Sequence, residues 1–264
     1  MDLGLETRTF IVTGASAGIG RATSELLVQE GARVVLVARG EERLEALEAE
    51  LRARGGDVLS IAADVSDPTS SDRIRDRALD GFGRIDGVVN TAGVSTGEHL
   101  RAYSDESWIE AYTVNALSAI RLSLACVPEM QKRGWGRIVT IGSTAGRDPD
   151  PRFASYGAAK AALMHATRAM SRSYSKYGIT SNCVLVGLTR SDSVLAGYAA
   201  AAEHMGVSAD DVEKRMMELQ PIAMGRTGAP EEIARTVVFL ASEASSWTTG
   251  VAVPVDGGTI RDLP

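Results

Sequence analysis

Short, mostly apolar runs recur along the chain, and longer stretches whose apolar residues follow helical spacing separate them. Runs of this length are typical of strands buried on both faces of a sheet. After the first run, apolar residues at positions 19, 22, 26 and 27 recur at helical spacing, and Gly31 can end that helix. The alternation predicts an α/β fold with a doubly wound parallel sheet of about seven strands and helices on both faces. The expected strands cover residues 9–12, 32–38, 58–63, 85–90, 138–141, 181–185 and 251–258.

The size of the chain fits one domain. It has 264 residues, of which 44% are hydrophobic, which is enough for one large core. We find no Pro/Ser-rich linker, charge block or repeat, so we expect a single domain over residues 1–264. Pro254 lies in the last apolar run, and because proline lacks a ladder donor, that strand is expected at an edge of the sheet.

The net charge and the hydropathy of the chain limit the kinds of partner that we expect. The formal net charge of −6 argues against a nucleic-acid surface, which would ordinarily carry a basic stripe. No apolar run reaches membrane-spanning length, and the first residues lack the pattern of a secretory signal. We therefore expect a cytoplasmic protein with neither a nucleic-acid nor a membrane partner.

Cysteines and histidines give no sign of a metal site. Cys126 and Cys183 have neither disulfide nor metal-ligand spacing and are expected to be buried free thiols. The three histidines are scattered along the chain. Of these, His99 and His204 fall where they could border a substrate, so they are candidates for substrate contact only.

A glycine-rich turn follows the first expected strand. Gly14, Gly18 and Gly20 lie between that strand and a helix, and a second strand follows at the right distance. Glycines let the backbone turn tightly and approach a diphosphate, while the free N–H groups at the helix start point at the anion. The pattern predicts a Rossmann-type nucleotide site.

Tyr156 and Lys160 are spaced to share one face of a helix, and Ser143 lies upstream at the end of an expected strand. A lysine ammonium held near a phenol lowers the phenol pKa and brings tyrosine into range as a general acid or base. This spacing also occurs by chance in many helices, so it gains meaning from the nucleotide site.

With these motifs the chain resembles the short-chain dehydrogenase/reductase family, in its ordinary-length branch, and is similar to 3-oxoacyl-carrier-protein reductases. The resemblance covers nearly the whole chain. Residues 13–20 resemble the TGxxxGIG cofactor motif, residues 90–93 the NNAG motif, and residues 182–187 the N-x-V-x-P-G segment. In that last segment Val186 replaces the usual proline, so the wall of the nicotinamide site is expected to be more mobile. The residues that match the family's catalytic tetrad are Asn115, Ser143, Tyr156 and Lys160.

The resemblance implies a role for each tetrad residue. The tyrosine exchanges a proton with the substrate oxygen, and the serine hydrogen-bonds that oxygen. The lysine lowers the tyrosine pKa and binds the nicotinamide ribose, and the asparagine holds a water in the proton relay. The residues implied to contact the cofactor are Gly14, Ser16, Gly18, Ile19, Gly20, Arg39, Asp64, Val65, Asn90, Ala92, Gly93, Tyr156, Lys160, Gly187 and Thr189. For Asp64, which is expected to face the adenine, a turn or N-cap role is the alternative.

The choice of cofactor depends on the end of the second strand. An acidic residue there would select NAD, but this chain has Arg39, which can pair with a 2′-phosphate and stack on adenine. Ser16 could add a donor, whereas Ala17 stands where many NADP users carry a second basic residue. We therefore expect NADP(H), with NAD(H) as the alternative.

By resemblance, residues 1–187 serve mainly cofactor binding and catalysis, residues 188–229 form a substrate lid, and residues 230–264 form a C-terminal helix and edge strand. The lid is rich in methionine, which favours a bulky hydrophobic substrate; the alternative is that these side chains pack the lid helices together. The candidate substrate contacts are Ser143, Phe153, Tyr156, Leu195 and Tyr198.

The predicted function is an NADP(H)-dependent oxidoreductase that reduces a ketone to a secondary alcohol by hydride transfer. One alternative is an NAD-dependent secondary-alcohol dehydrogenase, and another is a non-catalytic nucleotide-binding regulatory protein. The substrate is a small carbonyl or alcohol or a carrier-linked ketone, for which the basic residues Lys132, Arg133, Arg168, Arg172 and Lys176 offer a surface. Family members pair through helices that correspond here to residues 105–132 and 156–177 and through the terminal region, so a homotetramer is expected, with a dimer second.

Overall fold

The computed structural model describes residues 2–95, 97 and 100–261. In this part of the chain, seven strands form one parallel sheet in the order β3-β2-β1-β4-β5-β6-β7. The strands are β1 (Thr9–Thr13), β2 (Arg33–Ala38), β3 (Val58–Ala62), β4 (Gly87–Asn90), β5 (Gly136–Ser143), β6 (Ile179–Val186) and β7 (Ala252–Val255). The predicted doubly wound sheet is confirmed, with each strand within a few residues of its expected position.

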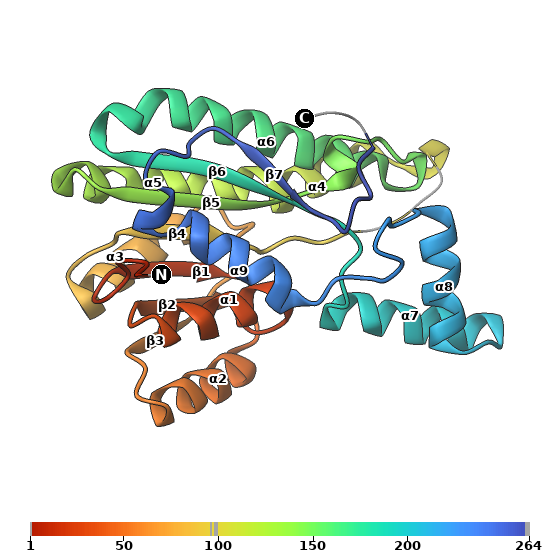
Figure 1. The fold of residues 1–264 in the computed structure, drawn as a ribbon, viewed down its shortest axis with the longest axis horizontal. Coiled ribbons are helices and arrows are strands. Elements are labelled where there is room, and N and C mark those ends of the chain that lie inside the picture. Colours follow the sequence, from red (N-terminus) through yellow and green to blue (C-terminus); the bar gives the residue numbers. More distant parts are fainter. Residues whose placement is uncertain (1, 96, 98–99, 262–264) are drawn as a thin grey trace.

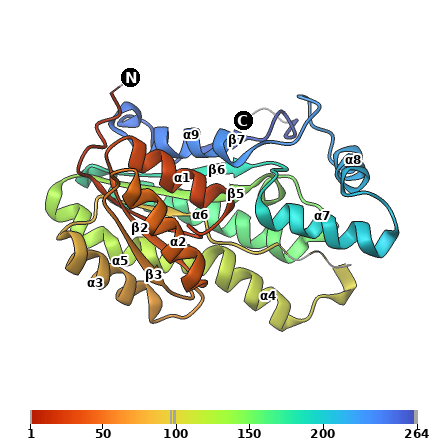
Figure 2. The same ribbon diagram turned by 90° about the horizontal axis from the view of Figure 1, so that it is seen from below.

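Helices cover both faces of the sheet (Figure 2). The helices are α1 (Gly18–Gln29), α2 (Glu41–Ala53), α3 (Ser70–Phe82), α4 (Asp105–Tyr112), α5 (Ser118–Arg133), α6 (Ala154–Tyr174), α7 (Asp192–Met205), α8 (Ala209–Leu219) and α9 (Pro230–Leu240). The cluster on one face takes its helical side chains from α1, α2 and α9. The cluster on the other face takes them from α3, α5 and α6.

Alternation along the strands builds these two cores. In β1, Phe10 and Val12 belong to the cluster under α1 and α9, whereas Ile11 between them belongs to the opposite cluster. All three are fully buried. Successive side chains of a strand point to opposite faces, so a strand covered on both sides reads as a continuous apolar run.

The order of the strands creates the crevice for a ligand. The chain begins at β1 in the middle of the sheet, winds outward to β3, and then returns across β1 to β4 and on to β7. Ligands of doubly wound sheets bind outside the carboxyl ends of the strands at the point where the direction of winding reverses. Here that point lies between β1 and β4, directly beside the glycine-rich turn after β1.

The structure differs from the prediction in the extent of two helices. A single helix was expected over residues 105–132, but α4 and α5 are joined by a π-helical turn, Thr113–Leu117. The helix expected over 156–177 begins earlier, at Ala154, and its last turn, Ser175–Tyr177, is a 3-10 turn. The π turn holds Asn115, and such turns are frequent at functional sites.

The last strand behaves as its proline predicts. Strand β7 pairs with β6 and closes one edge of the sheet. Pro254 is exposed within it. An edge strand needs ladder donors on one side only, so proline is tolerated there.

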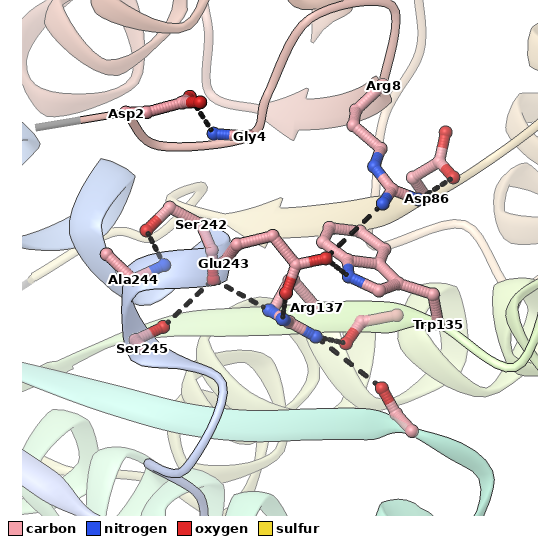
Figure 3. A network of polar contacts seen from close by, with 12 residues as sticks. Asp2, Gly4, Arg8, Asp86, Trp135, Arg137, Ser242, Glu243, Ala244 and Ser245 are labelled. Atoms are coloured by element: carbon pink, nitrogen blue, oxygen red, sulfur yellow. Dashed lines mark hydrogen bonds and ion pairs between the residues drawn. The ribbon is translucent and has the colours of Figure 1, made fainter.

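A polar network closes the amino ends of the strands (Figure 3). The Arg137 guanidinium, 2% exposed, donates to the carbonyls of Ser242 and Gly136 at 3.0 and 2.9 Å and forms an ion pair with Glu243 at 3.2 Å. The Trp135 ring lies between two guanidinium groups, with the Arg8 carbon 3.9 Å and the Arg137 carbon 4.1 Å from the ring centroid. The Trp135 Nε1 donates to Glu243 at 2.6 Å.

Helices α7 and α8 project beyond the carboxyl ends of the strands (Figure 1). They pack on each other through Tyr198, Ala202 and Val212. This pair of helices lies within the expected lid, residues 188–229. Among the described residues, no helix combines the length and the apolar character that crossing a membrane requires.

Candidate active site

Three tetrad residues meet in one cavity of about 250 Å³. Ser143 is the last residue of β5, and Tyr156 and Lys160 lie in the first two turns of α6. Gly157 lets α6 approach the end of β5, because a Cβ there would lie 2.7 Å from the Ala145 carbonyl oxygen. The strand end and the helix start therefore bring the serine and the tyrosine to the same cavity.

Burial sets the pKa of the tyrosine. Removal from water raises the pKa of Tyr156, and interaction with the Ser143 hydroxyl lowers it by less. The sequence predicted the opposite net shift, caused by Lys160. That prediction was wrong for the structure as described, because the Lys160 Nζ donates to the Ile141 carbonyl at 2.8 Å and lies 5.7 Å from the centre of the Tyr156 ring.

Burial shifts the pKa of Lys160 in the opposite direction. Lys160 is 3% exposed, and burial lowers its pKa to about 8. Nearby Cys183, itself a buried free thiol as predicted, opposes this shift slightly. A lysine pKa near neutrality lets the ammonium and the free amine both be populated at working pH, as a proton relay requires.

Asn115 holds the backbone of the neighbouring loop. Its Oδ1 accepts from the Val94 N–H at 3.0 Å, and its Nδ2 donates to the carbonyls of Val94 and Ala111 at 2.9 and 3.0 Å. The expected role was to hold a water. In the structure the side-chain amide positions Val94, next to the motif that ends in Gly93, and the role in holding a water stays a prediction.

The glycine-rich turn is built for close approach. Gly14 and Gly18 have φ of 65° and 53°, in the left-handed region that favours glycine. A Cβ on Gly20 would lie 2.2 Å from the Gly14 carbonyl oxygen, so a side chain cannot be placed there without moving the turn. Ile19 lines the catalytic cavity.

A second cavity of about 600 Å³ extends from the glycine turn along the carboxyl ends of β2, β3 and β4. It is lined by Gly14, Ser16, Arg39, Asp64, Val65, Ala92 and Gly93, all predicted cofactor contacts. Gly187 and Thr189 line the catalytic cavity with Tyr156 and Lys160. The backbone cradle and the two cavities, which share Gly93 in their linings, fit a dinucleotide.

Asp64 and Asn90, both predicted to contact the cofactor, form hydrogen bonds within the protein. The Asp64 Oδ1 accepts from the Ser66 N–H at 2.9 Å and from its hydroxyl at 2.7 Å, and these bonds lower the Asp64 pKa. This is the turn role that was the alternative for Asp64, although the residue still lines the cavity. Asn90 is 3% exposed, and its Nδ2 donates to the Ser123 hydroxyl at 3.0 Å. It does not line either of these two cavities, and its contact with a cofactor stays a prediction.

Sequence reasoning missed Arg43. It lies in the first turn of α2, four positions after Arg39, and lines the same cavity. The available signal was its place in the first turn of the helix that follows β2, close in sequence to Arg39. The position occupied by Ala17 is therefore not the only place for a second basic residue.

The substrate side differs from the prediction at two residues. Phe153 lines the catalytic cavity, as predicted. Tyr198 is 7% exposed and buried between α7 and α8, and Leu195 is 39% exposed and lies outside the described cavity lining. Tyr198 is buried because it lies on the face of α7 that packs against α8. The lining residues that the sequence did not indicate are Ser95, Val194, Met216 and Gln220.

Among the described residues, neither His204 nor Cys126 lines the two cavities. His99 lies outside the described residues, and His204 is exposed in the last turn of α7. Cys126 is buried, which raises its pKa to about 12. The described residues contain no group of histidine, cysteine or acidic side chains that could hold a metal ion.

Comparison with known proteins now identifies the family. A model of the short chain dehydrogenase family matches residues 8–199. The chain belongs to this family. It is thus an oxidoreductase, and the resemblance inferred from the motifs is confirmed.

Named relatives fall within the same family. The chain is 35% identical over 256 residues to the 3-oxoacyl-[acyl-carrier-protein] reductase FabG of Escherichia coli, covering 97% of this chain and 98% of that one. It is 34% identical to the uncharacterized oxidoreductase YvrD of Bacillus subtilis over the full length of both. Its structure is similar to that of L-sorbose reductase from Gluconobacter frateurii, complexed with NADPH and L-sorbose, with a TM-score of 0.96, 31% identity and full coverage of both chains.

Proposed function

We propose that this short-chain dehydrogenase uses NADP(H) to reduce a ketone to a secondary alcohol. The observation that carries the proposal is the meeting of Ser143, Tyr156 and Lys160 in one cavity that continues the glycine-lined cleft. A bound nicotinamide cofactor supplies the hydride. The protein's own residues bind the carbonyl oxygen and deliver a proton to it.

Tyr156 is the proton donor in this proposal. Its phenol is protonated at neutral pH, since burial raises its pKa above the ordinary value, and in the reductive direction it donates that proton to the substrate oxygen. The Ser143 hydroxyl hydrogen-bonds the same oxygen and stabilises negative charge as it develops. Lys160, with a pKa of about 8, passes a proton toward the tyrosine and binds the ribose.

Charge at the adenosine end favours NADP(H). Arg39 and Arg43 both line that cavity, and guanidinium groups bind phosphate through paired donors. The similarity to a reductase complexed with NADPH supports the same choice. An NAD-dependent secondary-alcohol dehydrogenase is the second candidate, because Asp64 lines the same cavity and lies close enough to Arg39 for the arginine's charge to lower its pKa.

The substrate is proposed as a carbonyl compound, free or carrier-linked. FabG is named for a substrate carried on acyl carrier protein, and the sorbose reductase for a sugar. We further propose a homotetramer. Apolar side chains are exposed on the α4–α5 face, at Ile109 (66%), Tyr112 (43%) and Leu124 (42%), and Trp247 near the edge strand is fully exposed. Burial of such patches stabilises subunit contacts.

The test of the proposed function is Tyr156→Phe. We expect turnover with a ketone substrate and NADPH to fall by about 10²–10⁴, because the variant has lost the general acid. Binding of NADPH, followed by fluorescence, should be nearly unchanged. Tyr177→Phe, which changes an exposed tyrosine beyond the end of α6, is the matched control.

Two outcomes would contradict the proposal. Unchanged turnover in Tyr156→Phe would remove the tyrosine from the reaction. Nucleotide binding by the wild-type protein, with no turnover on any carbonyl or alcohol, would favour the regulatory alternative.

A further inference from the structure

The lid helix α7 begins in contact with the helix of the glycine-rich turn. The carboxylate of Asp192, the first residue of α7, accepts from the N–H of Gly18, the first residue of α1, at 2.8 Å. The two residues are 174 positions apart in the sequence. This single bond therefore joins the expected lid to the nucleotide-binding turn.

Both charge and hydrogen bonding favour this position for a carboxylate. The first N–H groups of a helix have no acceptor within the helix, and the residue before α1, Ala17, has no side-chain oxygen to supply one. The partial positive charge at a helix N-terminus also attracts an anion. Asp192 meets both needs from a distant element.

The neighbouring residue closes over the same turn. A Cβ added to Gly18 would lie 3.1 Å from the Cβ of Ser191 and 3.9 Å from the carboxylate of Asp192. Ser191 also lines the catalytic cavity with Ile19. The segment 191–192 thus lies on the turn that, in the proposed function, receives the cofactor diphosphate.

We propose that Asp192 occupies the place of the cofactor diphosphate in the free protein and leaves it when the cofactor binds. The inference rests on the proposed function, since it requires a dinucleotide at α1. A carboxylate and a diphosphate repel each other at this range, and only one of them can accept from the Gly18 N–H. Asp192 is a positioning residue, because it acts through the lid and not on the reacting atoms.

The exchange couples the lid to the cofactor. Helix α7 packs on α8 through Tyr198, Ala202 and Val212, so release of Asp192 frees the start of a two-helix unit. Val194 of α7 and Met216 of α8 line the catalytic cavity. Release of Asp192 therefore changes the support of two helices that line the catalytic cavity.

The experiment measures binding to Asp192→Asn and Asp192→Ala. Both variants remove the competing charge, and the alanine also removes the acceptor. NADPH should bind about tenfold more tightly to them, a difference of about 1.4 kcal/mol. The probe 2′-AMP, which has the adenosine and the 2′-phosphate but no diphosphate, should bind all proteins equally. Asp210→Asn is the matched control, because it removes an exposed carboxylate from the first turn of α8.

The outcomes separate this inference from the proposed function. Wild-type protein that binds NADPH with the same affinity as both Asp192 variants overturns the inference and leaves the function standing. Equal tightening of NADPH and 2′-AMP, or of Asp192→Asn and Asp210→Asn, also overturns it, since the effect is then one of general charge. Failure of the wild type and of both variants to bind NADPH or NADH overturns the function and the inference together.

Discussion

At the amino ends of the strands, the Arg137 guanidinium donates to two backbone carbonyls and pairs with Glu243, and the Trp135 ring is stacked between two arginines. At the carboxyl ends, Lys160 is buried and Tyr156 is half-buried, the pKa values of both are moved away from their ordinary range, and two cavities open beside them. Both groups of residues lie at the ends of the same sheet. At the amino ends the charged groups of Arg137 and Glu243 are paired within the protein, and at the carboxyl ends polar groups line cavities that are open to a ligand.

This difference teaches where stability and function reside. Buried charges with several partners hold elements together, whereas groups with shifted pKa values in a cavity are candidates for chemistry. Changes at the amino ends should therefore alter the free energy of unfolding, and changes at the carboxyl ends should alter binding and turnover.

The largest expected effect on stability comes from Arg137→Ala. We expect the free energy of unfolding to fall by about 3 kcal/mol, because the carbonyls of Ser242 and Gly136 lose a charged donor and Trp135 loses one of its stacked cations. The affinity for NADPH should stay within about twofold, well below a tenfold change of 1.4 kcal/mol. Denaturant unfolding and a cofactor titration measure the two quantities.

Arg133→Ala is the control for this variant, since Arg133 is exposed at the end of α5. It should change stability by no more than about 0.5 kcal/mol. A loss of NADPH affinity in Arg137→Ala that matches its loss of stability would break the distinction between the two ends.

The sequence predicted most of the fold and the tetrad, for physical reasons. Strands buried on both faces appear as continuous apolar runs, and Gly14 and Gly20 are needed wherever the backbone turns against itself. The π-helical turn around Asn115 was not predictable, because a change from i→i−4 to i→i−5 bonding leaves no mark in composition. The burial of Tyr198 was missed for another reason. Its exposure depends on how α7 packs against α8, and tertiary packing of this kind cannot be read from the local sequence.

The second prediction concerns binding at the carboxyl ends. Arg39→Ala should weaken NADPH binding by about tenfold, because a charged hydrogen bond to phosphate contributes about 1.5–3 kcal/mol and this side chain is partly screened by water. NADH binding should not change. Arg43→Ala should act in the same direction but less, by about threefold, a smaller loss than one full charged hydrogen bond.

Stability is the control here, and neither variant should change it by more than about 0.5 kcal/mol. Equal weakening of NADPH and NADH would mean that Arg39 does not read the 2′-phosphate. That result would move the proposal toward the NAD-dependent alternative.

The third prediction tests whether a residue at the functional end lowers stability. The pKa of Lys160 is about 8 in the folded protein and 10.5 ordinarily. Between these values the unfolded chain holds a proton that the folded protein has released, so stability rises with pH in this window. Below about pH 8 both states are protonated and the contribution is constant.

Lys160→Met removes this contribution. From pH 8 to 9 the wild type should gain about 1 kcal/mol of unfolding free energy relative to the variant. The comparison cancels the contributions of Tyr156 and Cys126, whose raised pKa values lower stability as pH rises. It includes the interaction with Cys183, because the Lys160 charge lowers the pKa of that thiol. Identical pH dependence of the two proteins would show that Lys160 is not perturbed by burial.

The last prediction concerns Val186, which stands where the family has a proline. Val186 pairs in register with Ser143 of β5 and Val255 of β7 and is 9% exposed. Cys183 and Gly187 donate their N–H groups to β7, and because successive residues of a strand alternate, the Val186 N–H faces β5. The paired strand end argues against the mobile wall that the sequence suggested.

The sign of the effect of Val186→Pro distinguishes the two views. If Val186 is held by the sheet, proline removes a donor and lowers stability by about 1 kcal/mol. If the wall is mobile, proline restricts the unfolded chain and raises stability by about 0.4–1 kcal/mol. We expect the decrease, measured by denaturant unfolding beside a conservative Val186→Ile control. A decrease would place this strand end with the fully paired part of the sheet, so that the adaptable part of the carboxyl end begins only at Gly187, where the chain leaves β6 toward Asp192 and the lid.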